Sequence, residues 1–157
     1  MRKQVKGIEE TMHEAIMNSS LKENYQLINS IKGVGMQTAV AMIIHTNNFA
    51  GFQTARQIAA YCGCAPFPNE SGTIEKGNYV SRLANRELKV LLSQCAVSAL
   101  RYNRELAAYA QRKIAAGKSK RLVINNVKNK LIQRIFAVVT GKIPYRENYL
   151  NPFANYA

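Results

Sequence analysis

The sequence PNESGTIEKGNYVSRLANREL places serine hydroxyls among cations and turn-forming residues. Ser71 precedes a glycine, and Lys76, Arg82 and Arg86 follow it. A serine that attacks a phosphodiester needs a base to take its proton and positive charge around the phosphorane oxygens. The stretch supplies the cations but no convincing base. On residue chemistry alone a serine before a glycine is more often a turn residue, and Ser81 is a rival hydroxyl that could also cap the next helix.

A second chemical feature is the glycine pair in NSIKGVGMQTAVAMI, residues 29–43. Gly33 and Gly35 flank one valine between two helix-forming segments, which is typical of a helix-hairpin-helix. Glycines let the backbone approach a phosphate, and amides at the start of the following helix point at it. Such a contact reads the nucleic acid backbone rather than the bases. Lys32 would add a cation beside the same phosphate, and the alternative is a helical corner that only packs.

The positive charge lies almost wholly in the second half of the chain. The 157 residues carry 22 Lys and Arg against 9 acids, a net charge of +13. Residues 1–77 hold 7 basic and 6 acidic residues (+1), and residues 78–157 hold 15 and 3 (+12). A basic block along helices favours a polyanion as partner, most often nucleic acid. A solvated basic face is the alternative, and an acidic membrane fits less well because these helices also carry full apolar faces.

Composition excludes several other classes. All nine acids are glutamates, scattered singly apart from one adjacent pair, which argues against a self-contained metal-dependent nuclease. Cys62 and Cys64 are too close for a zinc knuckle, and with Cys95 they indicate reduced, buried thiols of a cytosolic protein. His13 and His45 stand alone, which favours packing or surface roles. The longest apolar run is AVAMII, so neither a secretion signal nor a membrane span is expected.

Apolar spacings of three and four residues predict an all-α fold. An N-terminal coiled-coil-like helix precedes a helix-hairpin-helix, a long irregular loop and a bundle of three longer helices. Ser20 with Glu23 predicts a capping box, Gln53 or Thr54 starts a short helix, and Asn103 caps a later one. The expected ranges are helices at 3–18, 21–30, 36–46 and 54–62, the loop at 63–80, and three helices within 82–140. The last helix is expected to point Lys120, Arg121, Lys128, Lys130 and Arg134 mostly outward.

Four separated stretches together resemble a known family. IKGVGMQTA, FAGFQTARQIAAYCGCAPFPNESGT, KGNYVSRLANRELKVLLSQCAVSALRYN and AAGKSKRLVINNVKNKLIQRIFAVVTGKIPY occur in this order. They resemble the C-terminal domain of the insertion-sequence one-ten transposases, relatives of the Piv-type DNA invertases. The resemblance covers roughly residues 24–146.

The resemblance implies a longer protein. Members join an acidic RuvC-like domain with a DEDD tetrad, through a coiled-coil segment, to a C-terminal domain with a required serine. Residues 1–20 are therefore expected to end that linker, 21–146 to form the C-terminal domain, with the helix-hairpin-helix at about 24–46, and 147–157 to be a tail. Without any aspartate the acidic domain is not hidden here, so we expect a fragment that does not cut DNA alone.

The resemblance also implies partners and a location. DNA is the expected partner, and a guide RNA is a further candidate because some members use one. We expect a homo-oligomer through the N-terminal helix and a bacterial cytoplasmic location. No cofactor is expected in this chain, whereas Mg²⁺ is expected for the missing acidic domain.

The resemblance assigns candidate site residues. The serine of the family's P-x-x-x-S-G pattern falls loosely on PFPNESG, and Ser71 becomes the expected nucleophile for a transient phosphoserine link to DNA. Ser81 is the second choice. A non-catalytic helix-hairpin-helix module and a helical protein–protein scaffold remain as alternatives. The expected nucleic-acid contacts are Lys32, Gly33, Gly35, Thr38, Lys76, Arg82, Asn85, Arg86 and Lys89.

Overall fold

The computed structural model describes residues 2–65, 67–71, 74–79 and 84–147. Within these residues the chain forms seven helices and one pair of strands. In order these are α1 (Arg2–Met17), α2 (Lys22–Asn29), α3 (Met36–His45), α4 (Ala55–Tyr61), β1 (Phe67–Ser71), β2 (Ile74–Tyr79), α5 (Arg86–Tyr102), α6 (Arg104–Ala115) and α7 (Lys120–Gly141). The predicted helical architecture is confirmed, including the three longer C-terminal helices. The predicted domain limits at residues 20 and 146 stay a prediction.

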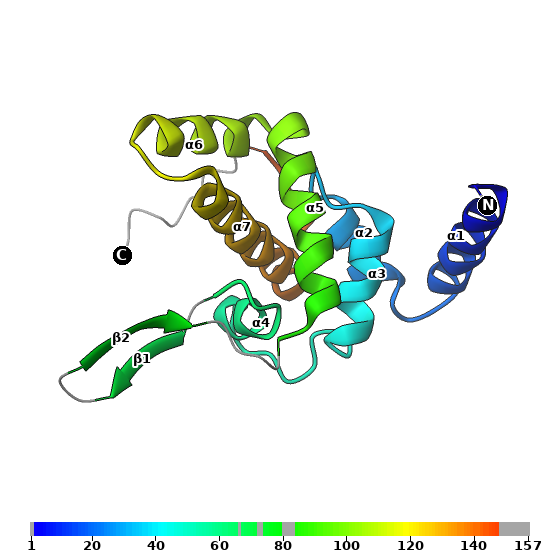
Figure 1. Ribbon diagram of the computed structural model, residues 1–157. Helices are drawn as coiled ribbons and strands as arrows, with labels where there is room; N and C mark the ends of the chain where they lie inside the picture. The colour runs from blue at the N-terminus through cyan, green and yellow to red at the C-terminus, as the bar shows by residue number, and fades with distance from the viewer. Residues whose placement is uncertain (1, 66, 72–73, 80–83, 148–157) are drawn as a thin grey trace.

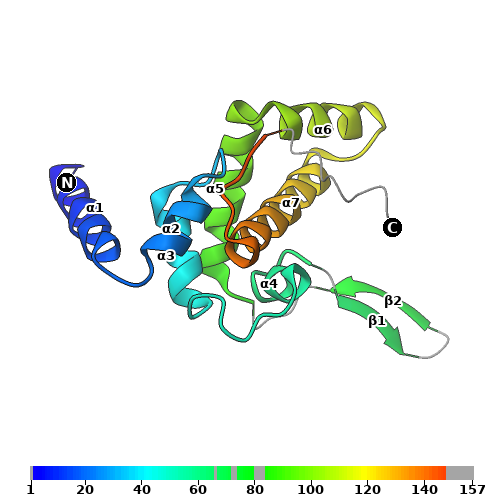
Figure 2. The same ribbon diagram turned by 180° about the vertical axis from the view of Figure 1, so that it is seen from behind.

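The helices α5 and α7 form the centre of the molecule, and α2, α3, α4 and α6 surround them (Figures 1 and 2). Their apolar faces meet in one core, in which the largest fully buried side chains include Ile28, Met42, Ile58, Leu92, Leu131 and Ile135. The helix α1 stands to one side of this body in both views. Its Val5 and Ile8 are 48% and 61% exposed, whereas Met12, Ile16 and Met17 in its second half pack against the core.

The predicted irregular loop at 63–80 is wrong for most of its length. The strands β1 and β2 pair antiparallel, with Phe67 opposite Tyr79 and Ser71 opposite Ile74, and the register shifts between Phe67 and Asn69. This hairpin projects from the α4 end of the body (Figures 1 and 2). The sequence of this segment shows no strand pattern, because its prolines and glycines interrupt any regular alternation of apolar residues. The strands are held by hydrogen bonds between their backbones, which apolar periodicity does not indicate.

Two of the predicted helix caps are confirmed. Thr54 begins α4 with a capping box, in which its hydroxyl accepts from the Gln57 amide and the Gln57 side chain accepts from the Thr54 amide. Asn103 begins α6, and its side-chain oxygen accepts from the Leu106 amide at 3.1 Å. In both cases a short polar side chain satisfies an amide that the first helical turn leaves unpaired.

Two other predicted helix caps are wrong. The capping box of Ser20 and Glu23 does not form, because the residue before α2 is Leu21 and no side chain caps that helix. The cap of α5 is Asn85, whose side-chain oxygen accepts from the Leu88 amide at 3.0 Å. Ser81 lies outside the described residues.

The side chain of Lys128 departs from its predicted outward position, since it is only 7% exposed. Its neighbours Asn125 and Asn129 both donate from Nδ2 to the carbonyl of Cys64, at 3.0 and 3.1 Å. This polar stripe of α7 therefore packs against the chain just after α4. Polar residues at helical spacing look solvent-facing in a sequence, but here they satisfy a backbone group that would otherwise be buried unpaired.

No helix among the described residues is long and apolar enough to cross a membrane.

Candidate nucleic-acid interface

The turn between α2 and α3 is anchored by its apolar residues. The side chains of Ile31 and Val34 are buried, and the Val34 amide donates to the Ile31 carbonyl at 3.0 Å. This inward packing leaves Gly35 exposed at the start of α3. The local order of apolar and glycine residues therefore decides which part of the turn faces solvent.

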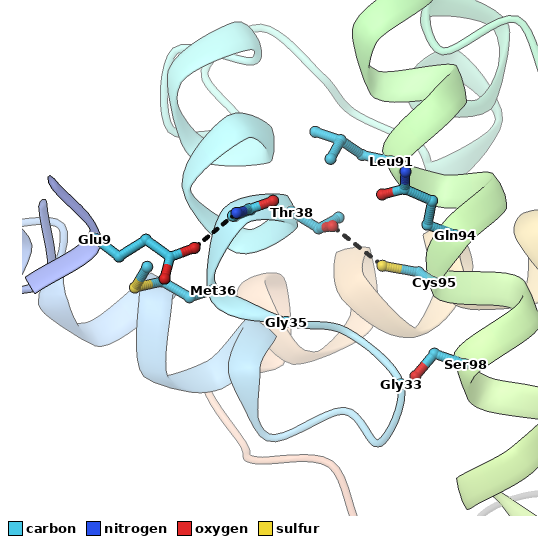
Figure 3. Close-up of a pocket in the computed structure, with 10 residues that line it drawn as sticks. Glu9, Gly33, Gly35, Met36, Thr38, Leu91, Gln94, Cys95 and Ser98 are labelled. Atoms are coloured by element: carbon cyan, nitrogen blue, oxygen red, sulfur yellow. Dashed lines mark hydrogen bonds between the residues drawn. The ribbon is translucent and has the colours of Figure 1, made fainter. Parts of the chain in front are cut away.

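Gly33 is required by a close approach to α5. It has a φ of +100°, and an added Cβ would lie 2.6 Å from the Ala99 Cα and 2.8 Å from the Ala99 nitrogen. Real Cβ atoms do not come so near to backbone, so any larger residue would push the turn away from α5. Figure 3 shows Gly33 beside α5, next to Ser98. Gly33 therefore packs against α5 at a place where no larger residue fits.

Gly35 is different, because nothing lies within 4 Å of an added Cβ and its φ is −94°. It occupies the N-cap position of α3, where no side chain caps the helix. The structure shows no acceptor, within the ranges that it describes, for the amides of Met36, Gln37 and Thr38. Unpaired amides and the positive end of the helix dipole make such a terminus attractive to an anion.

A shallow pocket of about 380 Å³ opens at this terminus (Figure 3). Gly35, Met36 and Gln37 form one side, and the exposed side of α5 forms the other. The lining residues are Glu9, Gly33, Gly35, Met36, Gln37, Thr38, Leu91, Gln94, Cys95 and Ser98. The two glycines of the sequence motif therefore share one pocket with the start of α3.

A carboxylate from α1 already approaches this pocket. The Gln37 Nε2 donates to Glu9 Oε1 at 2.7 Å, which Figure 3 marks. The Thr38 hydroxyl lies 3.1 Å from Cys95 Sγ in the core, so Thr38 can offer a ligand only its amide. Glu9 was not among the predicted site residues, because nothing in the apolar pattern of α1 indicates that this residue meets the start of α3.

Lys32 is also held by a distant acid. Its ammonium lies 2.9 Å from Glu147 Oε2, and the amide of Tyr145 donates to Ser30 Oγ at 2.8 Å. The segment after α7 therefore runs beside the turn and shares the cation predicted for a phosphate. Glu147 was not among the predicted site residues either.

A second group of predicted residues lies at the start of α5. Asn85 is occupied as the helix cap, and its Nδ2 lies 3.4 Å from the hydroxyl of Tyr61. Arg86 is exposed and Lys89 is half-buried. They lie at the end of α5 that contacts α4, where the Asn85 amide donates to the Tyr61 carbonyl at 2.8 Å.

Two buried thiols, Cys62 and Cys64, follow α4, and burial and nearby charges shift their pKa values. Burial raises the pKa of the Cys64 thiol, and the ammonium groups of Lys128 and Lys89 lower it in part. Burial, with the neighbouring Cys64, raises the pKa of Cys62 to about 12. Both thiols and Cys95 are free and buried, as the sequence predicted. The positive potential at Cys64 comes from two helices that are far apart in sequence.

The structure does not bring Ser71 together with these groups. Ser71 ends β1 at the far end of the projecting strand pair, and Lys76 lies opposite Asn69 in β2. Ser81 and Arg82 lie outside the described residues. The predicted site residues with described positions therefore fall into three places: the α2–α3 turn, the start of α5, and the strand pair.

Neither histidine contributes a metal site. His13 packs edge-on against Tyr25 with ring centroids 5.8 Å apart, and His45 Nε2 lies 3.1 Å from Glu87. Within the described ranges no group of three or more His, Cys, Asp or Glu side chains could hold an ion.

Comparison with known proteins places these features in a family. Residues 25–111, which include the α2–α3 turn, the strand pair and α5, match the family described as Transposase IS116/IS110/IS902. An uncharacterized 43.6 kDa protein of insertion element IS110 from Streptomyces coelicolor is 28% identical over 80% of this chain and 32% of its own length. The pilin gene-inverting proteins of Moraxella lacunata and Moraxella bovis are each 28% identical, over 83% and 80% of this chain. The matches span 42% and 39% of those two relatives, so the chain covers less than half of each relative. Because the family match extends over more than half of its residues, this chain belongs to the Transposase IS116/IS110/IS902 family.

Proposed function

We propose that this chain binds duplex DNA as the C-terminal part of a transposase or site-specific recombinase. The start of α3 would hold one backbone phosphate. The observation that carries the proposal is the open N-terminus at Gly35, where the amides of Met36, Gln37 and Thr38 face a pocket without a capping side chain. A phosphate there would accept hydrogen bonds from these amides and gain from the helix dipole.

Such a contact would position the protein without reading sequence. The bound phosphate would replace or adjoin the Glu9 carboxylate that now accepts from Gln37. Lys32 would contribute its charge only by sharing it with Glu147, 2.9 Å away. The geometry thus favours moderate, salt-dependent affinity at this one place.

The sharpest test is Gly35→Asp. An aspartate at an N-cap stabilises a helix, because its carboxylate accepts from the free amides of the first turn. The same carboxylate would repel a phosphate and occupy its donors. Gly35→Asp should therefore keep or raise the melting temperature while lowering the affinity for duplex DNA on the order of tenfold, the effect of losing about one phosphate contact at ~0.1 M salt.

The matched control is Thr54→Asp, which adds the same charge at the N-cap of α4. Its affinity, measured by fluorescence anisotropy with a labelled duplex, should stay within about twofold of the unmodified chain. If Gly35→Asp binds as tightly as Thr54→Asp, the start of α3 is not a phosphate site.

We further propose Ser71 as the nucleophile of strand exchange, with Ser81 as the second choice. This assignment rests on the resemblance of PFPNESG to the family pattern and on the place of Ser71 at the end of β1. The Ser71 Oγ would bond to phosphorus as the bond from phosphorus to a deoxyribose oxygen breaks. The base and the Mg²⁺ ions would come from the acidic domain that the resemblance implies.

The nucleophile is tested in a polypeptide that joins this chain to an acidic domain of its family. Ser71→Ala should abolish recombination and the covalent adduct with labelled DNA while leaving DNA affinity unchanged. Ser81→Ala is the matched control and should retain both activities. Undiminished recombination by Ser71→Ala would refute the assignment, and loss only in Ser81→Ala would move it to that residue.

A non-catalytic backbone-binding module is the second candidate. It is favoured by the placement of Ser71, which lies apart from the turn and from the start of α5. Under this function both serine variants would recombine normally and only Gly35→Asp would weaken binding. A protein–protein scaffold would instead show no DNA affinity that falls with salt.

A further inference from the structure

The helices α6 and α7 carry most of the positive charge of the molecule. Residues 104–141 contain nine Lys and Arg and one acid, Glu105, a net charge of +8 out of +13. Glu105 is already engaged, because its Oε2 lies 2.7 Å from Arg134 Nη2. The other eight cations of residues 104–141 have no carboxylate partner in the part of the chain that the structure describes.

Three of these cations converge on one aromatic ring. Lys130 Nζ lies 4.6 Å from the ring centroid of Tyr109, Lys113 Nζ 5.8 Å and the Arg112 guanidinium carbon 5.9 Å. Arg112 and Lys113 come from α6 and Lys130 comes from α7, so the cluster lies where these two helices meet (Figures 1 and 2). We call these four residues the Tyr109 cluster.

In the Tyr109 cluster the cations are attracted by the ring but repel one another. Each cation is attracted by the face of the ring, typically by about 0.5–1 kcal/mol at exposed sites. The three like charges also repel one another, and no carboxylate among the described residues pairs with any of them. An anionic ligand would relieve it, which distinguishes this cluster from surface lysines that already face a carboxylate.

We infer that the Tyr109 cluster binds the phosphate backbone of duplex DNA, at a place separate from the start of α3. The inference rests on the proposed DNA-binding function and adds a second contact surface to it. Lys120 and Arg121, both exposed, begin α7 about 15 Å along the helix from Lys130, and Lys128 between them is buried. Duplex DNA presents about nine phosphate charges over that length.

The chemistry of the cluster favours a duplex over a single strand. Proteins hold single strands by stacking bases on open aromatic faces. The ring of Tyr109 is instead half-buried and approached by three cations. Ammonium groups on flexible stems bind phosphates as point charges, without the fixed geometry that base reading needs.

The test removes two cluster charges with the double variant Lys113→Gln and Lys130→Gln in the full chain. Anisotropy with a labelled duplex is measured over a salt series from about 50 to 200 mM. Each phosphate contact contributes about 0.9 to the slope of log K against log salt. The slope should therefore fall by about 1.8 and the affinity at ~0.1 M salt by roughly 60-fold.

The matched control is Lys6→Gln with Lys22→Gln, which removes the same net charge from α1 and α2. Both lysines are exposed and lie outside the Tyr109 cluster. This control should change the slope by less than half as much. Circular dichroism and the melting temperature must show that both double variants are folded, and Tyr109→Leu, which keeps all charges, should lower the affinity only about two- to fivefold.

The outcomes separate this inference from the proposed function. If the unmodified chain shows no salt-dependent affinity for duplex DNA, both fail. If Gly35→Asp weakens binding while the cluster variant equals its control, only the inference about the Tyr109 cluster is refuted. A duplex RNA of equal length serves as a further arm, and cluster-dependent binding of RNA but not of DNA would overturn the assignment to DNA.

Discussion

Replacing Gly33 by alanine gives a quantitative test of how the turn is held against α5. The added Cβ would face the backbone of Ala99, with its Cα at 2.6 Å and its nitrogen at 2.8 Å. A φ of +100° is also a conformation that L residues rarely adopt. Two separate costs therefore act on the same variant.

Each cost has an approximate size. The left-handed backbone costs an alanine about 1–2 kcal/mol, and forcing a methyl group into a packed contact costs about 1–3 kcal/mol. The free energy of unfolding should fall by about 2–5 kcal/mol in total. Domains of this kind are stable by about 5–15 kcal/mol, so this loss is a large fraction.

Gly117 provides the matched control. Its φ is +81°, but nothing lies within 4 Å of an added Cβ. Gly117→Ala therefore bears only the backbone cost of about 1–2 kcal/mol. Urea unfolding followed by circular dichroism should show Gly33→Ala to be less stable than Gly117→Ala by about 1–3 kcal/mol, or roughly 2–12 °C in melting temperature.

A second-site variant makes the test sharper. Ala99→Gly removes the Ala99 Cβ, 2.7 Å from the added methyl, but leaves the Cα at 2.6 Å. In the Gly33→Ala background it should therefore recover little stability. Equal stability of Gly33→Ala and Gly117→Ala, or full recovery by Ala99→Gly, would refute the close backbone contact.

Two further predictions follow from the electrostatics. Glu9→Gln keeps an acceptor for Gln37 but removes the charge beside the start of α3, so the affinity for duplex DNA should rise about two- to fivefold. The control Glu14→Gln lies on the same helix outside this pocket and should leave the affinity unchanged. If the affinity of Glu9→Gln is also unchanged, Glu9 is not part of the interface. The Cys62 thiol has its pKa raised from 9.0 to about 12, so the unfolded chain loses this proton at lower pH than the folded chain. The stability that Cys62 contributes should be complete below about pH 9 and decline as the pH rises towards about 12. The free energy of unfolding of Cys62→Ala, measured in urea, should therefore fall less over this pH range than that of the unmodified chain. An equal fall in both proteins would contradict the raised pKa.

Much of the helical framework was predictable because its apolar positions repeat at helical spacing. The caps at Thr54 and Asn103 were readable too, since each precedes its helix directly. The burial of Lys128 was not predictable, because a polar residue at helical spacing carries no sign that another element covers it. The strands were not predicted for a related reason, because their pairing depends on hydrogen bonds between backbones rather than on side-chain type.

The candidate site was predictable only where it is local. The glycine pair marks the turn correctly, but the requirement for Gly33 comes from Ala99, which is distant in the sequence. The acids that modify the turn are also distant. Glu9 meets Gln37 across 28 residues and Glu147 meets Lys32 across 115. Such pairings follow from how α1 and the segment after α7 pack, which a single sequence does not specify.

The helix α5 separates the proposed anchoring from the proposed chemistry. The turn contacts Ala99, near the end of α5, whereas α4 meets the start of α5 through the hydrogen bond from the Asn85 amide to the Tyr61 carbonyl. The strand pair with Ser71 projects from that α4 end (Figures 1 and 2). The pocket at the start of α3 lies against α5 between Leu91 and Ser98, which is about 9–20 Å of helix from Asn85 or roughly three to six base pairs along a duplex. Because Ser71 ends β1 at the far end of that strand pair, a phosphate held at the start of α3 would not be the one that Ser71 attacks under the proposed function.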